Sequence, residues 1–315
     1  MKPGESNSDA DPQSGWTPEP PGRRSPKAWL LLGALVVIWG TAFVFTRVAV
    51  ETIPAVSVAA SRILIGALVL GIGVRLAGLP IPRKPAIWLH LLALGLLGNA
   101  LPFFLIGWGQ ERVPSSVAGL IMGVMPLMTF VLAHRFLPGE RLTLQRSLGL
   151  GLGLVGVALL LDPGRTAGSE LGSLWRHLAI VCGAICYAAN GVVGRFLPPL
   201  HPAVASAGSL AMASAVIVPV ALIREGIPTG PLATAAWGSV VWLGLVATAG
   251  ATVIYFTIIR SAGPTFLSLI NYLIPGVALF SGVTFLGEAL HAQSIVALGV
   301  ILAGVALAQR SAAPD

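Results

Sequence analysis

Charged residues are scarce in this sequence of 315 residues. Asp, Glu, Lys and Arg make up 10% of it, whereas soluble domains carry about a quarter charged residues. Cysteine is rarer still, because Cys182 and Cys186 are the only two. They lie four residues apart in one apolar stretch, which leaves no disulfide framework and no zinc-site spacing, and we interpret them as small packing residues. These shortages exclude a water-soluble domain as the body of the protein.

Runs of basic residues are absent as well. The net charge is +7, and its excess is dispersed over loop ends rather than clustered in a stretch that could follow a phosphate backbone. We therefore expect no nucleic-acid partner. The chain also has no G-x-x-x-x-G-K sequence, so it does not hydrolyse ATP itself, and we expect no cofactor, no metal site and no enzymatic activity.

Apolar residues, by contrast, are abundant, at 55% of the chain. They fall into ten continuous runs, each long enough to cross a hydrocarbon core of about 30 Å as a helix. Continuous runs predict helices rather than the short alternating strands of a membrane barrel. The predicted spans cover residues 28–49, 55–75, 87–107, 113–134, 142–161, 174–195, 202–223, 233–258, 264–286 and 292–309.

The segment before the first span differs in composition. Residues 1–27 contain six prolines and almost nothing apolar, so we predict a disordered, solvated tail. With this tail in the cytoplasm, thirteen of the 19 Lys and Arg residues lie on the cytoplasmic side and five on the other, with Arg62 inside a span. Cytoplasmic loops carry such an excess. We therefore predict a multi-pass protein of the plasma membrane with both termini in the cytoplasm.

The sequence repeats itself at a period of 148–149 residues. The matched residues include Trp39 and Tyr187, Pro54 and Pro202, Gly95 and Gly244, Pro126 and Pro275, and Glu140 and Glu288. These matches predict two five-span repeats, over residues 28–162 and 174–310, that surround a central cavity. Since five is odd, the second repeat enters the membrane inverted. Inverted repeats are the architecture of alternating-access transporters, which hold substrate between the halves near the midplane.

On these residues the chain resembles the EamA-type branch of the drug/metabolite transporter superfamily. The resemblance rests on Trp39-Gly40 in the first span, Arg62 in the second, the two repeated prolines, and the Gly139-Glu140 and Gly287-Glu288 pairs. Each of those pairs precedes a glycine-rich helix that ends in Gly-Val-Ala-Leu. The similar region covers residues 28–310. One departure is Leu210, which occupies the position in the second repeat that is equivalent to Arg62.

The resemblance implies a secondary transporter of the bacterial inner membrane. Its implied substrate is a small organic metabolite, such as an amino acid, and its implied direction is outward. No Asp or Glu lies at mid-depth of a span, which favours facilitated diffusion or exchange over proton antiport. Two alternatives stay open: an integral membrane enzyme acting on a lipid-linked substrate, and a regulatory membrane protein that does not transport.

Polar and aromatic side chains inside spans are the best indicators of a site, since they are costly in lipid and face the bundle interior. Rings and amides together suit a small amphipathic metabolite, although the same groups also hydrogen-bond between helices. The predicted substrate-binding residues are Trp39, Arg62, Asn99, Tyr187, Asn190, Tyr255, Asn271 and Tyr272. Arg62 has two interpretations: a structural pairing with backbone carbonyls or a nearby glutamate, or binding of an anionic substrate group.

Three further features complete the prediction. Pro126 and Pro275 each remove a backbone hydrogen bond within a span, so we predict bends with a gating role. The glycine-rich fifth and tenth spans permit close helix approach, either within the monomer or in a homo-oligomer. Glu140 and Glu288 are expected to favour the helix dipole at the starts of those spans.

Overall fold

Ten apolar helical segments build the protein, as predicted. The computed structural model describes residues 25–140, 142–161, 171–226 and 233–310, so most of the predicted tail of residues 1–27 lies outside the described residues. The first half comprises α1 (Pro26–Val50), α2 (Ala55–Leu76), α3 (Pro85–Gly95), η1 (Leu96–Ala100), α4 (Leu101–Gln110), α5 (Ser115–Ile121), η2 (Met122–Val124), α6 (Met125–Phe136) and α7 (Leu144–Leu161).

The second half repeats this order. It comprises α9 (Leu171–Val193), η3 (Gly194–Phe196), α10 (Pro202–Glu225), α11 (Thr234–Trp242), η4 (Leu243–Gly250), α12 (Ala251–Ala262), α13 (Pro264–Leu267), α14 (Ile270–Leu286) and α15 (Ala292–Arg310). Eight of the described segments are long and apolar enough to cross a membrane, and the shorter apolar helices Leu144–Leu160 and Ile270–Leu286 complete the ten.

Prolines mark several helix starts. Ser25 accepts a hydrogen bond from the Ala28 N–H through its Oγ, and Pro26 follows at the first helical position, where a missing N–H does no harm. Pro202 is the first residue of α10 in the same way, whereas Pro54 and Pro114 are the N-cap residues directly before α2 and α5. Within each helix the backbone groups bond to one another, as lipid requires.

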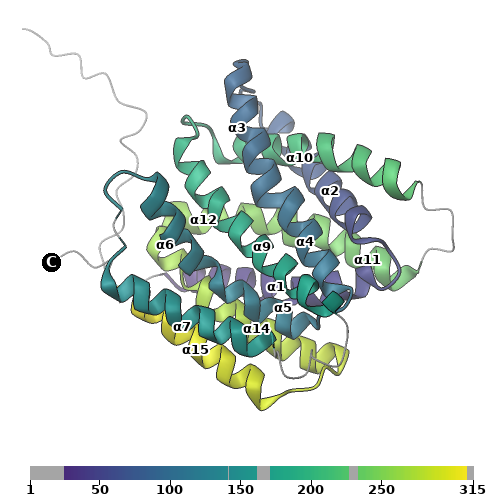
Figure 1. Ribbon diagram of the computed structural model, residues 1–315. Coiled ribbons are helices and arrows are strands. Elements are labelled where there is room, and N and C mark those ends of the chain that lie inside the picture. Colours follow the sequence, from purple (N-terminus) through teal and green to yellow (C-terminus); the bar gives the residue numbers. More distant parts are fainter. Residues whose placement is uncertain (1–24, 141, 162–170, 227–232, 311–315) are drawn as a thin grey trace, which may run out of the picture.

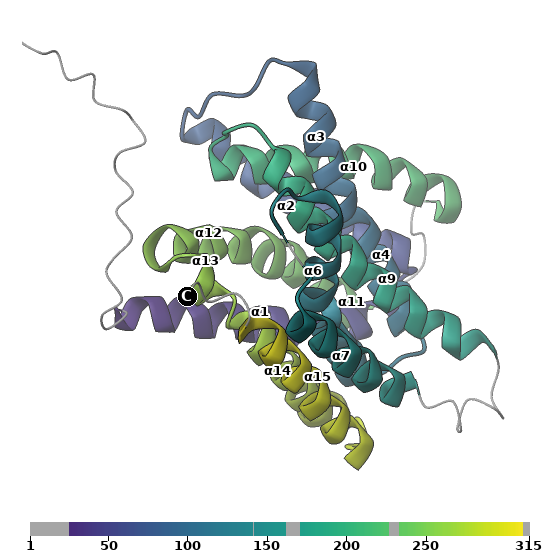
Figure 2. The ribbon, with the colours of Figure 1, turned by 60° about the vertical axis from the view of Figure 1, so that its left-hand side comes forward.

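Each half packs its first helix into the other half. Helix α1 contacts α14, α11 and α12, whereas α9 contacts α4 and α6. Two further pairs join equivalent helices: α2 packs along α10, and α7 packs along α15, as both views show (Figure 1, Figure 2). The two repeats therefore form one interlocked bundle rather than two separate domains.

Glycines in α7 and α15 serve this internal packing. A Cβ on Gly304 would lie 2.6 Å from the Gly149 carbonyl oxygen, and one on Gly156 would lie 3.1 Å from the Ala297 carbonyl oxygen. Such approach is possible only without side chains. Of the two uses predicted for these glycines, packing within the monomer is the one present in the structure.

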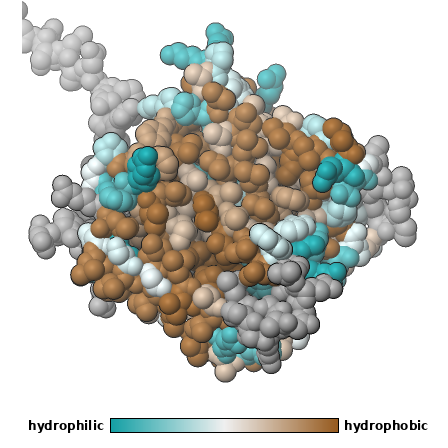
Figure 3. Space-filling view, viewed as in Figure 1, coloured by the Kyte–Doolittle hydropathy of each residue, from teal (hydrophilic) through white to brown (hydrophobic). Residues whose placement is uncertain are grey.

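The surface is apolar over most of the visible face, and hydrophilic residues gather toward its edges (Figure 3). Large side chains that point outward include Leu68, Ile72, Phe280 and Phe285. Exposed apolar surface on this scale is incompatible with water but suits a bilayer.

Candidate substrate site and end contacts

Spans three and eight are not continuous α-helices. Each contains a π-helical segment, η1 in the first repeat and η4 in the second, and the matched pair Gly95 and Gly244 lies at the start of these segments. Pro102 follows η1 and has no N–H to bond one turn back, whereas η4 contains no proline. π-helical turns are rare and occur frequently at functional sites. The sequence comparison matched the glycines but did not predict the π-helical geometry.

Trp39 and Tyr255 meet beside η4. The Trp39 indole Nε1–H donates to the Ala247 carbonyl oxygen at 3.1 Å, which joins α1 to η4 across 208 residues of sequence. The Trp39 and Tyr255 ring centroids are 5.8 Å apart, with the ring planes tilted by 44°. Two aromatic rings from different repeats thus lie together, with the indole polar atom satisfied.

Arg62 lies against the same segment. Its Nε and Nη2 both donate to Thr248 Oγ1, at 3.3 and 3.2 Å, and its Cζ lies 3.6 Å from the Phe103 ring centroid. The side chain is only 7% exposed. Within the described ranges no carboxylate lies within 4.0 Å of it, so its charge is held by a hydroxyl and a ring face.

Tyr187 and Asn190 approach from α9. The Tyr187 ring centroid is 6.5 Å from that of Phe103, and a Cβ on Gly98 would lie 2.7 Å from Asn190 Oδ1. Gly98 precedes Asn99 in η1. We call the residues around the two π-helical segments the central cluster: Trp39, Arg62, Asn99, Phe103, Tyr187, Asn190, Thr248 and Tyr255.

Asn271 and Tyr272 complete the predicted set. The Tyr272 hydroxyl donates to Gln309 Oε1 of α15 at 2.5 Å, Tyr272 packs against the same apolar cluster as Tyr187, and Asn271 makes no side-chain hydrogen bond to a described residue. Pro126 follows the 3-10 turn η2, and Pro275 lies inside α14. A Cβ on Gly123 of η2 would lie 3.6 Å from Pro275 Cγ, so spans four and nine touch at their interruptions.

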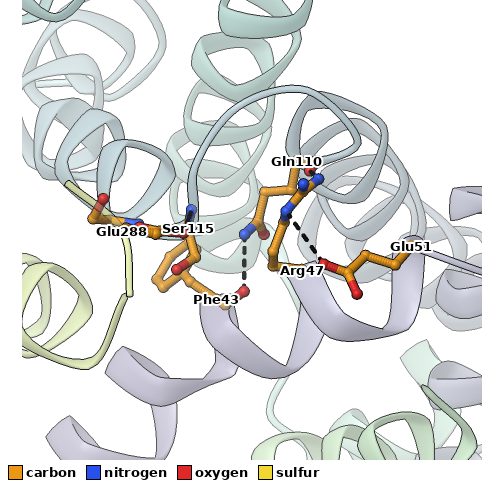
Figure 4. Close-up of polar contacts among 7 residues, drawn as sticks. Phe43, Arg47, Glu51, Gln110, Ser115 and Glu288 are labelled. Carbon is orange, nitrogen blue, oxygen red and sulfur yellow. Dashed lines mark hydrogen bonds and ion pairs between the residues drawn. The ribbon is translucent and has the colours of Figure 1, made fainter. Parts of the chain in front are cut away.

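A second group of polar contacts ties together the membrane end where α4 stops and α5 begins, here named the α4–α5 end. Glu288 accepts hydrogen bonds from the backbone N–H groups of Ser115 and Ser116, at 2.6 and 2.9 Å. Both carboxylate oxygens therefore cap α5 (Figure 4). Because α15 starts at Ala292, Glu288 serves the start of a helix in the other repeat, which the sequence did not predict.

Gln110 holds α1 and α4 together at the same end. Its side-chain Nε2 donates to the Phe43 carbonyl oxygen at 2.8 Å, and its backbone carbonyl oxygen accepts from Arg47 Nη1 at 2.5 Å. Gln110 is 0% exposed, and Arg47 also lies 4.0 Å from Glu51 (Figure 4). Nearby, a Cβ on Gly119 would collide with the Ala278 side chain, so α5 and α14 are in close contact.

The opposite end of the bundle lacks these contacts. Glu140, the repeat equivalent of Glu288, pairs with Arg146 at 3.1 Å. A Cβ on Gly191, at the position equivalent to Phe43, would find no atom within 4 Å. Arg195, equivalent to Arg47, makes no ion pair or side-chain hydrogen bond with a described residue. The two ends therefore differ, and their sequences differ as well. At the offset of 149 residues, Ile259 stands in place of Gln110, and Pro264, which has no N–H to donate, stands in place of Ser115.

Comparison with known proteins identifies the architecture. The model of a family described as the EamA-like transporter family matches residues 27–162 and again residues 174–309. The chain belongs to this family. An EamA-family assignment agrees with the resemblance noted in the sequence and makes the protein a transporter rather than a membrane enzyme.

Other known proteins are similar to this chain over most of its length. The chain is 27% identical to the inner membrane transporter YedA of Escherichia coli, over 88% of each chain. It is 28% identical to a protein of Streptantibioticus cattleyicolor named probable terminal-alkyne amino-acid exporter, over 91% of this chain and 94% of the other. A crystal structure at 24% identity matches with a TM-score of 0.65, covering 92% of this chain and 98% of that one.

Two members of the central cluster of this EamA protein were missed from the sequence. Phe103 is one apolar ring among many, so nothing distinguished it. Thr248 was detectable, because it lies 149 residues after Asn99 and therefore holds the equivalent position in η4. No group of three or more His, Cys, Asp or Glu side chains that could hold a metal exists among the described residues.

Proposed function

We propose that this EamA-family protein is a secondary transporter that exports small organic metabolites, such as amino acids, across the bacterial inner membrane. The observation that carries the proposal is the central cluster, in which polar and aromatic side chains of both repeats meet at matched π-helical segments. A site at the junction of inverted repeats is the arrangement that alternating access requires. The Streptantibioticus relative supports amino acids as the substrate class and export as the direction.

The difference between the two ends supports a transport cycle. With both termini in the cytoplasm, as the Lys and Arg distribution favours, the α4–α5 end faces the periplasm. That end is capped and closely packed, whereas the matched contacts at the cytoplasmic end are absent from the described residues. This is the arrangement expected of a state closed to the outside, and release of the contacts at the α4–α5 end opens the site to that side.

Counterflow in proteoliposomes tests this function. Purified protein is loaded with an unlabelled amino acid, and entry of the labelled compound is followed for each member of an amino-acid panel. We expect saturable counterflow that Trp39→Ala lowers about tenfold, the loss expected when an aromatic contact worth about 1.5 kcal/mol is removed. Trp175→Ala is the matched control, because Trp175 is 61% exposed on α9.

Three outcomes decide the proposal. Flux that falls in Trp39→Ala and not in Trp175→Ala supports the central site. Equal flux in both variants contradicts this location. Binding of panel members by the wild type without any flux contradicts transport and favours a regulatory membrane protein.

A further inference from the structure

We propose that Arg62 binds the carboxylate group of the transported molecule, so that the substrates are small amphipathic carboxylates. This inference rests on the proposed function and deepens it by assigning the group that is recognised. It concerns a cation that is 7% exposed and lies within a membrane span. A buried charge in that position is costly and usually has a functional partner.

The contacts of Arg62 orient the guanidinium without neutralising it. Thr248 Oγ1 is a single neutral acceptor shared by Nε and Nη2, and the Phe103 ring covers one face. A guanidinium carries five N–H donors, and Nη1 donates to no residue within the described ranges. Thr248 lies on the side of Nε and Nη2, and the edge formed by Nη1 and Nη2 offers two parallel N–H donors that can bind a carboxylate.

The second repeat allows a test of the alternative that Arg62 serves helix packing alone. Leu210 holds the position equivalent to Arg62 and is 2% exposed. Helix α10 packs on span three at Gly95, where an added Cβ would collide with the Ser209 carbonyl oxygen. Helix α2 packs on span eight at Gly244, where an added Cβ would lie 2.6 Å from Ile65 Cβ and 3.2 Å from the Arg62 carbonyl oxygen. Because α10 packs on span three with a leucine at this position, packing of this kind does not by itself require an arginine in α2.

The surroundings of Arg62 suit the rest of an amphipathic molecule. Arg62 bonds to Thr248 and Trp39 bonds to Ala247, which are neighbours in η4. A carboxylate held by Arg62 therefore leaves the remainder of the molecule near the Trp39 and Tyr255 rings. Ring faces cover apolar groups and attract an ammonium, which matches an amino acid in its zwitterionic form.

The test compares each labelled amino acid of the counterflow panel with its carboxamide, which has the same shape without the negative charge. We expect the wild type to prefer the acid by about tenfold to a hundredfold, the size of one or two charge-assisted hydrogen bonds. Arg62→Leu, which copies the repeat equivalent, removes this preference, because it lowers flux of the acid more than flux of the carboxamide. Thr248→Val preserves the shape of the side chain and lowers the preference in part, because the guanidinium loses its orienting acceptor.

If Arg62 has a structural role and does not bind substrate, a different result is expected. In that case Arg62→Leu lowers flux of the acid and the carboxamide equally, and this outcome overturns the inference. Equal flux of both compounds in the wild type overturns it as well, while leaving transport intact. No saturable flux of any compound in the wild type contradicts the proposed function itself. If Arg62→Leu does not fold, Arg62→Lys and Thr248→Val decide the question, since both must reduce the preference for the acid.

Discussion

Glu140 and Glu288 hold equivalent places in the two repeats, yet their partners differ in kind. Glu288 reaches into the other repeat and caps α5 with both oxygens, whereas Glu140 pairs with Arg146, six residues further along its own repeat. At one end Glu288 makes a contact between the two repeats. At the other end the equivalent Glu140 makes a contact within its own repeat. The repeat keeps both glutamates but not their partners, since the position equivalent to Ser115 is Pro264, which has no N–H to donate.

The comparison shows that the two repeats are held in unequal arrangements. One capping contact between repeats is made by Glu288, and Glu140 makes no such contact with a described residue. The following predictions test this difference between the ends, from the largest expected effect to the smallest.

Gly119→Val should have the largest effect, because its side chain would collide with Ala278 at the α4–α5 end. Overpacking of this kind lowers the free energy of unfolding by about 3 kcal/mol. Gly276→Val is the matched control on α14, since a Cβ there meets no atom within 4 Å. Thermal unfolding in detergent measures the stability of both variants. Equal stability of the two variants would show that the α4–α5 end is not closely packed.

Glu288→Gln should open the α4–α5 end. A glutamine offers one acceptor oxygen, so one of the Ser115 and Ser116 N–H groups loses its partner, and a charged hydrogen bond is worth about 1.5–3 kcal/mol. Ser116→Cys, in a background with Cys182 and Cys186 replaced by alanine, reports accessibility because Ser116 is 4% exposed. We expect its maleimide labelling to accelerate about tenfold in Glu288→Gln. An unchanged rate would mean that the carboxylate does not hold the end closed.

Trp39→Phe and Tyr187→Phe compare the repeat equivalents in the central cluster. Trp39→Phe loses the hydrogen bond to the Ala247 carbonyl oxygen, and such bonds in membranes are worth about 0.6 kcal/mol. The Tyr187 hydroxyl makes no hydrogen bond to a described residue, so Tyr187→Phe should leave stability unchanged. Chemical unfolding of the two variants and the wild type side by side checks the difference. A larger loss for Tyr187→Phe would contradict the assigned contacts.

Glu140→Gln should have the smallest effect. The Glu140 side chain is 39% exposed and its partner Arg146 is 12% exposed, and ion pairs near the surface contribute about 0.5 kcal/mol or less. We expect neither the unfolding free energy nor Ser116→Cys labelling to change measurably. Faster labelling in this variant would mean that the two glutamates act together rather than separately.

Most of the fold could be predicted from sequence, whereas the partners of individual residues could not. The ten spans and the two repeats follow from hydropathy and self-similarity, which are properties of the chain read in order. The meeting of Trp39, Arg62, Tyr187 and Tyr255 was anticipated only as a set of polar residues in lipid. Tyr272 was grouped with them, but its hydroxyl bonds to Gln309. Hydropathy indicates which polar side chains are costly in lipid. It does not indicate which neighbour forms a hydrogen bond with each of them.

The sequence by itself determined the class of protein: a bundle of apolar helices in two inverted repeats, since the water-to-lipid free energy of a segment depends on its own composition. Only the tertiary structure decided that Arg62 faces Thr248, 186 residues away, and that Glu288 caps Ser115, 173 residues away. Both contacts depend on how helices cross and where π-helical turns rotate the side chains. Those features arise from the packing of the whole bundle, so no local stretch of sequence encodes them.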